Sequence, residues 1–391
     1  MNVLIVLSRF VSVLLLAIGF VLQPDLSLAS EWNQWRGPHR DGRVDGSDWP
    51  DNFSGLERIW HADLGRGYSG PLVVGDRVFV TESVDRETEA VRALSRETGE
   101  QLWQVSWPGR GKVPFFAARN GNWIRSTPLH DGEALYVGGM EEVLVKLDAD
   151  DGSELWRVNF PQRFGTNLPA FGFVSSPLID GDALFVQAAN SIVKLDRQTG
   201  ETLWRQLAGS EDIYSNGAFS SPVVAHLAGR RQLLVQTREA LHGLDPENGE
   251  VFWRQPVPSF RGMNILTPVV DGDQILTSTH RHGTYLFGIS YKDGRFESRE
   301  IWRSKVQGYM SSPVVVGDQA YLHLGNGRVA CVELANGSDC WISKPFGKYW
   351  SMALQQDKIL ALDEGGELIL VRANPQSIQV LDSQQISNQS T

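Results

Sequence analysis

The sequence predicts an all-β protein, a single β-propeller of seven four-stranded blades. A ten-residue phrase that begins with Leu-Asp and ends in tryptophan recurs at residues 147–156, 195–204 and 244–253. The repeat tryptophans at positions 103, 156, 204, 253 and 302 lie 53, 48, 49 and 49 residues apart. Between them recurs a second phrase of small polar residues, a proline and alternating apolar residues. A period of about 50 residues with four short strands per unit is typical of a propeller blade.

The strands of one unit follow from its turns. In the copy at residues 174–186, the first strand follows Pro177 and the second is an apolar run that begins at Ala183. The third strand ends in Leu-Asp and the fourth contains the tryptophan. Asp-Gly, Thr-Gly and Asn-Gly pairs supply the positive φ angles of tight hairpins. No segment has a sustained helical period, which excludes a helical solenoid.

Six units carry both phrases, and the seventh, from Trp350 onward, lacks a tryptophan strand. Residues 56–60, which end in Trp60, form an orphan strand near the N-terminus. We predict that this strand joins the last blade and closes the ring, which removes exposed sheet edges. Residues 377–383 are an alternative fourth strand, and eight blades stay open as an alternative count. We expect the repeat tryptophans to pack between blades as structural residues: Trp60, Trp103, Trp156, Trp204, Trp253, Trp302 and Trp341.

Residues 1–29 are predicted to be a cleavable secretory signal, with Arg9 before an apolar run at residues 10–22 and Ala29 at the cleavage point. An uncleaved anchor is the alternative. Residues 30–55 form an extended segment, residues 56–383 the propeller, and residues 384–391 a polar tail. No cysteine lies near the cleavage point, so we expect a periplasmic or secreted protein without a lipid anchor.

The composition limits the partners. A net charge of −10 and a pI near 5.4 argue against a nucleic-acid surface. No segment of the mature chain is apolar for long enough to span a bilayer, and we expect a monomer.

Cys331 and Cys340 flank the turn of one blade hairpin, where they could face each other as a structural disulfide.

The phrase Leu-Asp-x-x-Thr-Gly-x-x-x-Trp resembles the repeats of pyrroloquinoline-quinone (PQQ) enzymes, and the resemblance covers the chain from about Leu56 onward. The opening at residues 32–42 is similar to the head of secreted PQQ-like repeat proteins. This family also includes the periplasmic scaffold of the outer-membrane barrel-assembly machine. The present chain departs from that scaffold in lacking the lipid-attachment cysteine and in having one blade fewer.

The resemblance does not by itself imply the cofactor. Quinone dehydrogenases of this fold place a disulfide of adjacent cysteines over PQQ and a tryptophan beneath it. They also hold calcium with acidic and amide side chains and use a catalytic aspartate. Because Cys331 and Cys340 are nine residues apart, we expect no cofactor, with PQQ plus calcium as the alternative. We assign no catalytic or metal-binding residue, since His280 and His282 lack a third ligand.

The repeat phase places the long blade-to-blade connections on one face, opposite the short Asp-Gly and Thr-Gly turns. Long loops gathered on one rim are where propellers bind, and aromatic and arginine residues make binding hot spots. The predicted partner-binding residues are Phe115, Phe116, Arg119, Trp123, Arg125, Phe171, Phe173, Tyr214, Phe219, Tyr309 and Trp350. The ligand expected there is an envelope protein or an anionic, sugar-like molecule. The alternative is that these aromatics fold inward and cap the ring.

The sequence therefore favours a non-catalytic, exported binding or assembly scaffold of the cell envelope. One alternative is an oxidoreductase that depends on PQQ or another quinone and has a degenerate site. Another is a structural unit that works only inside a larger assembly.

Overall fold

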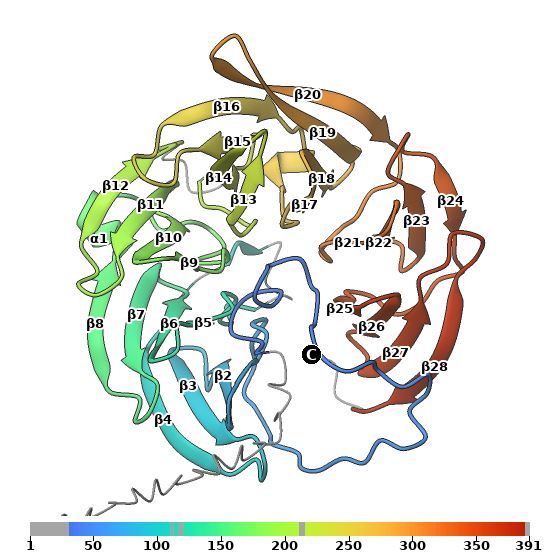
Figure 1. Ribbon diagram of the computed structural model, residues 1–391. Coiled ribbons are helices and arrows are strands. Elements are labelled where there is room, and N and C mark those ends of the chain that lie inside the picture. Colours follow the sequence, from blue (N-terminus) through green and yellow to red (C-terminus); the bar gives the residue numbers. More distant parts are fainter. Residues whose placement is uncertain are drawn as a thin grey trace, which may run out of the picture.

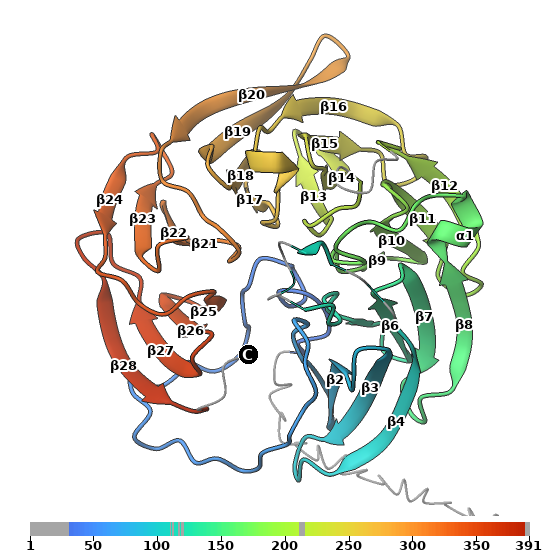
Figure 2. The same cartoon turned by 180° about the vertical axis from the view of Figure 1, so that it is seen from behind.

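The computed structural model describes residues 31–387, apart from residues 110, 112, 116–117, 119–120 and 211–215. In this part of the chain the strands form seven four-stranded antiparallel sheets. The sheets stand as blades around a central axis and follow one another in chain order (Figures 1 and 2). The predicted seven-bladed propeller is confirmed. The predicted signal at residues 1–29 lies outside the described residues.

Blades 1 to 4 make up the first part of the ring. Blade 1 consists of β1 (Leu72–Val74), β2 (Arg77–Ser83), β3 (Thr88–Ser95) and β4 (Gln101–Pro108). Blade 2 consists of β5 (Leu129–His130), β6 (Ala134–Gly139), β7 (Val143–Asp148) and β8 (Glu154–Asn159). Blade 3 consists of β9 (Leu178–Asp180), β10 (Ala183–Ala188), β11 (Ser191–Asp196) and β12 (Thr202–Gln206). Blade 4 consists of β13 (Val223–Leu227), β14 (Arg230–Gln236), β15 (Ala240–Leu244) and β16 (Val251–Pro256).

Blades 5 to 7 complete the ring. Blade 5 consists of β17 (Val269–Asp271), β18 (Gln274–Thr279), β19 (Gly283–Lys292) and β20 (Arg295–Ser304). Blade 6 consists of β21 (Val314–Val316), β22 (Gln319–His323), β23 (Val329–Glu333) and β24 (Asp339–Ile342). Blade 7 consists of β25 (Ser351–Gln355), β26 (Lys358–Leu362), β27 (Glu367–Arg372) and β28 (Gln379–Gln385). A short helix α1 (Phe160–Phe164) follows blade 2, and a 3-10 turn η2 (Phe260–Gly262) follows blade 4. No helix of the described chain is long and apolar enough to cross a membrane.

The recurring tryptophan links each blade to the next. The Trp156 indole lies against Gly200 in the next blade's hairpin turn and donates a 3.3 Å hydrogen bond to the carbonyl of Arg197. Gly200 has a φ of +71°, and a Cβ there would lie 3.1 Å from the indole ring, so the Thr-Gly pair suits both the turn and the ring. Equivalent indole bonds to a carbonyl of the next blade come from Trp60, Trp103, Trp204, Trp302 and Trp341.

Trp253 is different. Its indole donates to Gln232 Oε1 within its own blade, at 2.7 Å. The next hairpin, β19–β20, has ten residues in each strand and extends outward beyond the ring (Figure 1). Its two-residue turn, Asp293 and Gly294, lies at the far end of these long strands, beyond the position of the turns against which the other indoles lie.

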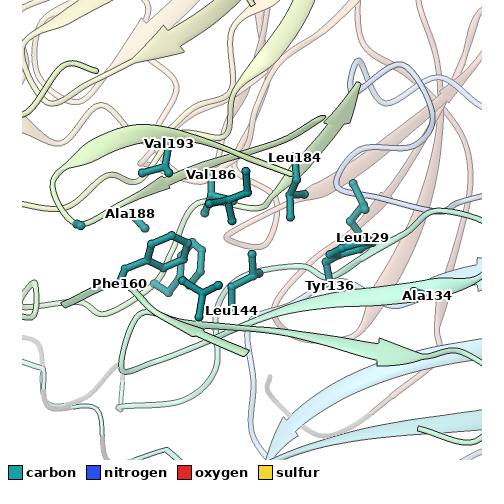
Figure 3. Packing of buried hydrophobic residues seen from close by; sticks show 13 residues of the cluster. Leu129, Ala134, Tyr136, Leu144, Phe160, Leu184, Val186, Ala188 and Val193 are labelled. Atoms are coloured by element: carbon teal, nitrogen blue, oxygen red, sulfur yellow. The ribbon is translucent and has the colours of Figure 1, made fainter. Parts of the chain in front are cut away.

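Apolar side chains of neighbouring blades fill the space between the sheets. Figure 3 shows one such cluster, in which Tyr136 and Leu144 of blade 2 meet Leu184 and Val186 of blade 3. All four are fully buried. Each side chain of this size stabilises the fold by about 1.5–3 kcal/mol when removed from water. Interblade packing of this kind forms the core.

In several blades the small polar residue before the proline has a structural role around the axis. The backbone N–H of Thr127 donates to Ser176 Oγ in the next blade, and that of Ser176 donates to Ser221 Oγ, both at 3.0 Å. Thr267 N–H and Ser312 Oγ repeat this contact between blades 5 and 6. A short hydroxyl at this position therefore joins the inner strands of neighbouring blades.

The first described residues fill the central channel. Trp32 pairs with Val73 of β1, and Val44 donates to the carbonyl of Leu354 in β25. Between them, Trp35 Nε1 donates to Thr267 Oγ1 at 2.9 Å, which ties the segment to blade 5. In Figures 1 and 2 this segment passes across the middle of the ring, then runs around the outside of β28 to blade 1. We call residues 31–44 the plug.

Two buried arginines hold the plug on opposite sides. Arg36 donates to the carbonyl of Pro313 at 2.6 Å, and Arg40 donates to those of Pro177 and Ser176. Burial lowers the pKa of Arg36 to about 10 and that of Arg40 to about 9. Both guanidinium groups use backbone carbonyls as acceptors.

The predicted closure by an N-terminal strand is wrong. The fourth strand of blade 7 is β28, the local alternative, and residues 56–60 form no strand. The N-terminal segment instead crosses the junction by side-chain contacts. Phe53 N–H donates to Asp382 of β28 at 2.7 Å, and Trp60 lies on Gly99 of blade 1. Since β28 has no tryptophan, Trp60 provides the contact that the preceding blade would otherwise supply.

The possible disulfide between Cys331 and Cys340 is not formed in this structure, where both residues are free thiols. Cys331 pairs with Trp341, and a bulge between Cys331 and Val332 leaves Cys340 with no residue directly opposite. The pKa of Cys331 lies well above its usual range, chiefly because the thiol is buried and also because it contacts the Cys340 thiol. The predicted end of the propeller at residue 383 lies inside β28, which ends at Gln385.

Candidate functional site

The two faces of the ring differ in their connections. The first-to-second and third-to-fourth turns lie on one face, which we call the short-turn face. The second-to-third turns and the blade-to-blade connections lie on the other, the long-loop face. Because every blade runs up and down in strand order, this division holds for all seven blades.

Aromatic rings meet in a row on the long-loop face near the channel mouth. The ring centroid of His280 lies 5.7 Å from that of Phe260 and 4.8 Å from that of Tyr309. Tyr309 in turn lies 6.1 Å from Tyr349. None of the four is buried. We call these four residues the aromatic row; it spans the connections that lead into blades 5, 6 and 7.

Arginine side chains lie over several rings of this face. The guanidinium carbon of Arg281 is 4.2 Å from the Phe260 ring centroid, and that of Arg261 is 5.2 Å from it. Outside the row, Arg125 lies 5.0 Å from the Tyr68 ring and Arg66 lies 4.9 Å from Trp123. Cation–π contacts of this kind are worth about 0.5–1 kcal/mol at exposed sites. They hold flat, partly exposed rings in place.

The pKa values of the Tyr349 phenol and the His280 imidazole are shifted from their usual ranges. The pKa of Tyr349 is raised by burial first, and then by Tyr309, Glu364 and Tyr68. These contributions place Tyr68, at the other end of the chain, next to the row. Burial and the neighbouring Arg281 lower the pKa of His280. Both groups are therefore neutral at pH 7, and the row offers ring faces and hydroxyl groups rather than charge.

A small hollow of about 80 Å³ lies beside the row, lined by Tyr309, Lys348, Tyr349 and His323 among others. His323 Nε2 lies 2.8 Å from the carbonyl of Gly347, and its ring stacks on Trp350 at 5.3 Å. Burial lowers the pKa of His323. The hollow is too small for a drug-sized ligand, for which about 300–1,000 Å³ is usual, so the face suits an extended contact.

Several predicted residues lie on this face. Phe115 is 91% exposed, while Trp123 and Arg125 are half-buried and take part in the cation–π contacts. Phe171 and Phe219, from the connections that lead into blades 3 and 4, lie edge to face with centroids 5.5 Å apart. Tyr309 belongs to the aromatic row. Phe116, Arg119 and Tyr214 lie outside the described residues.

Two of the predicted residues cannot meet a partner. Phe173 is 1% exposed and Trp350 is 2% exposed. Phe173 packs against Phe160 and against the backbone of Gly138, where a Cβ would lie 2.8 Å from its ring. Trp350 lies between His323 and Phe346. At these two positions the connection has already entered the space between blades, so the inward-folding alternative is correct there.

The predicted partner-binding set does not include Tyr68, Phe260, His280 or Tyr349. Tyr68 and Phe219 each lie three residues before the proline of the inner-strand phrase, and Tyr309 lies four before it. An aromatic at this spacing was therefore a usable signal for Tyr68. His280 gave no comparable signal, since it lies in a second-to-third strand turn.

The described residues do not match the donor set of a quinone site. Cys331 and Cys340 lie on β23 and β24, the third and fourth strands of blade 6, away from the axis. The axis itself holds the plug, with Arg36 and Arg40 bonded to backbone carbonyls. Within the ranges that the structure describes, no three His, Cys, Asp or Glu side chains gather as metal ligands would.

The chain is similar to proteins of two kinds. A model of the family described as outer membrane protein assembly factor BamB matches residues 87–343. The BamB of Yersinia pestis is 22% identical over 297 residues, which cover 73% of this chain and 70% of that protein. The polyvinylalcohol dehydrogenase of Sphingopyxis sp. (strain 113P3) is 26% identical over 209 residues, which cover 48% of this chain and 30% of that protein.

Solved structures show the same two kinds. The BamB of Moraxella catarrhalis superposes with a TM-score of 0.58 at 17% identity, over 81% of this chain and 85% of that one. The quinohemoprotein alcohol dehydrogenase of Comamonas testosteroni superposes with a TM-score of 0.61 at 13% identity, over 91% of this chain and 73% of that one. At these identities the likeness shows the shared fold.

Proposed function

Because this chain belongs to the family described as outer membrane protein assembly factor BamB, we propose that it is a non-catalytic scaffold of the cell envelope. In this proposal it is exported to the periplasm, where a protein partner binds to the long-loop face. An anionic or sugar-like ligand is an alternative occupant of the same face.

The observation that carries the proposal is the aromatic row with its arginines. Phe260, His280, Tyr309 and Tyr349 are in contact, partly exposed and gathered at the channel mouth. Aromatic and arginine side chains dominate the binding energy of protein interfaces. The row offers ring faces and hydroxyl groups, which are suited to binding a partner.

The relatives support this proposal unequally. The match to the Yersinia pestis BamB spans most of both proteins. The match to the polyvinylalcohol dehydrogenase spans 30% of that enzyme, so its repeats are shared over a short part of its length. Repeats of this kind are structural, and they carry no chemistry of their own.

The test is capture of partners from a native envelope extract with the intact protein and with Tyr309→Ala/Tyr349→Ala. We expect the double variant to lose its partner while its unfolding midpoint stays close to that of the parent. Tyr291→Ala is the matched control, since Tyr291 is an exposed tyrosine on the β19–β20 hairpin, outside the row. A partner retained equally by all three proteins would contradict binding at the row.

The second candidate is an oxidoreductase with a degenerate quinone site, favoured by the polyvinylalcohol dehydrogenase similarity and the dehydrogenase fold. Titration of the protein with PQQ and calcium, followed by a dye-linked assay with alcohols, separates the two candidates. Heat of binding at micromolar protein together with turnover would replace the scaffold proposal.

A further inference from the structure

The long-loop face carries charge of one sign over blades 5, 6 and 7. Five segments form this part of the face: the connections into these blades, residues 257–266, 305–313 and 343–350, and the second-to-third strand turns of blades 5 and 6, residues 280–282 and 324–328. The five segments contain no aspartate or glutamate, although these residues outnumber lysine and arginine by 46 to 36 in the whole chain. Their cations are Arg261, Arg281, Lys305, Arg328, Lys344 and Lys348. A local excess of cations on an acidic protein attracts a negatively charged partner.

Several of these cations are available to such a partner. Arg281, Lys305 and Lys348 are exposed, and none of the three forms an ion pair with a carboxylate of the described residues. In the neighbouring turn of blade 7, Asp363 is buried and its carboxylate accepts two backbone N–H groups of that turn. Glu364 of the same turn lies near the row, and one carboxylate does not balance the cations of the five segments.

Ring contacts hold the arginines of this surface. Arg281 lies on the Phe260 ring at 4.2 Å, and Arg261 lies 5.2 Å from the same ring. The carbonyl of Arg261 accepts a 2.7 Å hydrogen bond from Arg238, whose guanidinium carbon lies 5.0 Å from the Phe219 ring. A guanidinium group that is already held on a ring loses less freedom when it binds, and its fork of N–H donors matches the two oxygens of a carboxylate.

These contacts continue past both ends of the aromatic row. At one end, Phe219 leads to Phe171 in the connection into blade 3, with ring centroids 5.5 Å apart. At the other end, Tyr349 lies near Tyr68, and Arg125 lies 5.0 Å from the Tyr68 ring. Rings and arginines therefore follow one another through the connections of most blades around the channel mouth. A ligand that uses them must be extended rather than compact.

The hollow beside the row favours a peptide as this ligand. It has about 80 Å³ and is lined by Tyr309, Lys348 and Tyr349 among others, which is about the space of one side chain. An anionic membrane offers no side chain to fill it. Binding to a membrane surface also requires apolar side chains that enter the headgroup boundary, whereas Phe260, His280 and Tyr309 are half-buried.

We propose that the aromatic row and its cations bind an extended acidic peptide segment of the partner. Carboxylates of the segment pair with Arg281 and Lys348, and an apolar side chain between them enters the hollow at Tyr309 and Tyr349. Several carboxylates are needed because the cations are spread over three blades. The proposal names the chemical class of the partner and rests on the proposed binding at the long-loop face.

The probe is a peptide of four glutamates around a central leucine, blocked at both ends. It is titrated calorimetrically into the full chain at low ionic strength, where charge attraction is screened least. We expect binding that weakens as salt is added. The same peptide with glutamines in place of the glutamates is the matched control and should bind at least about tenfold more weakly. Absence of binding at millimolar peptide, or equal binding of the two peptides, would overturn the proposal.

Two charge-matched variants locate the site. Arg281→Glu/Lys348→Glu should weaken binding of the acidic peptide at least about tenfold. Lys292→Glu/Arg295→Glu makes the same change of charge at the exposed tip of the β19–β20 hairpin and should leave the affinity within about twofold of the parent. All four substituted side chains are exposed, and urea unfolding checks that both variants keep the parent midpoint. An equal loss of affinity in the two variants would show that net charge, and not this surface, binds the peptide.

Two further measurements separate the alternatives. Vesicles of phosphatidylglycerol that bind through Arg281 and Lys348, while the acidic peptide does not bind, would replace the peptide by a membrane. If the acidic peptide fails but Tyr309→Ala/Tyr349→Ala still loses its captured partner, the acidic class is wrong and the proposed function stands. If that tyrosine variant retains its partner, the proposed function itself is wrong.

Discussion

The indole nitrogen of Trp60 donates a 2.8 Å hydrogen bond to the carbonyl of Arg96. Trp60 lies in the N-terminal segment, a few residues after Phe53, which contacts blade 7. Arg96 lies in the turn between the third and fourth strands of blade 1. This contact occupies the place that the tryptophan of a preceding blade takes elsewhere in the ring. The junction between the last and first blades is therefore sealed by a side chain rather than by a shared strand.

We predict that Trp60→Ala destabilises the protein by about 2–3 kcal/mol, less than a fully buried tryptophan because the side chain is half-buried. Trp60→Phe keeps a ring on Gly99 but loses the indole N–H, and should cost about 1 kcal/mol. Urea unfolding measures both. Leu102→Ala, at a half-exposed position of β4, is the control. Equal midpoints for Trp60→Ala and the control would mean that the junction does not depend on this contact.

Two buried carboxyl groups should make stability depend on pH. Burial raises the pKa of Glu89 to about 7 and that of Glu142 to about 8. Their unfolded values are about 4.3, so the folded protein binds these protons more tightly than the unfolded chain. The stabilising contribution is complete below about pH 4 and is lost as the pH rises through 7 and 8, with a slope of about 1.4 kcal/mol per pH unit for each ionising group.

Glu142→Gln should flatten this dependence, because the amide oxygen can still accept the N–H of Ala189, as the carboxyl does at 3.1 Å. The free energy of unfolding measured from pH 5 to pH 9 tests it. Glu201→Gln, an exposed position, should keep the slope of the parent. A slope that is the same in all three proteins would show that Glu142 does not titrate in this range.

The plug depends on Arg40. Arg40→Ala leaves a cavity and removes the donors to the carbonyls of Ser176 and Pro177, so we expect a loss of about 3–5 kcal/mol. Arg43→Ala, at an exposed arginine that bonds to Val315, should cost less than about 1 kcal/mol. Thermal unfolding of the two variants makes the comparison. A larger loss for Arg43→Ala would mean that the outer end of the segment anchors the plug.

Phe171 and Phe173 should behave in opposite ways although they are two residues apart. Phe173→Ala should destabilise the fold by about 3–5 kcal/mol, because the ring is buried between blades 2 and 3. Phe171→Ala should cost less stability and weaken a partner of the long-loop face. Urea unfolding combined with partner capture distinguishes the two effects. Partner loss without destabilisation in Phe173→Ala would contradict the burial of that ring.

The thiols should react in a fixed order. Cys340 is half-exposed, whereas Cys331 is fully buried and has a raised pKa. Iodoacetamide at pH 8 should therefore label Cys340 in the native protein and label Cys331 after denaturation, as read by peptide mass spectrometry. Cys340→Ser should abolish native labelling. Protein isolated from an oxidising compartment with neither thiol labelled after denaturation would point to the disulfide.

The repeat made the blade fold predictable. Each unit carries its own proline, its own glycine turn and its own tryptophan, so every strand is specified by residues within about 50 positions of it. The long-loop face was predictable for the same reason, since loop length follows from the spacing of the phrases. Phe219 and Tyr309 were found in this way.

Other features required the tertiary structure because they depend on contacts between distant segments. The Phe53–Asp382 hydrogen bond that crosses the ring junction joins residues 329 positions apart. No local pattern distinguishes β28 from an N-terminal strand as the partner of β27. Whether an aromatic in a long loop faces solvent also depends on the neighbouring blade, as Phe173 shows by packing on Gly138.

The amino-acid sequence alone thus predicted the ring of blades and the face with long loops, because these follow from short-range periodicity, and the structure decided between seven and eight blades. The tertiary structure decided how the ring closes, which rim aromatics are buried, and that the central channel holds the plug. These features depend on contacts between segments that are far apart in the sequence, and short-range periodicity does not encode such contacts.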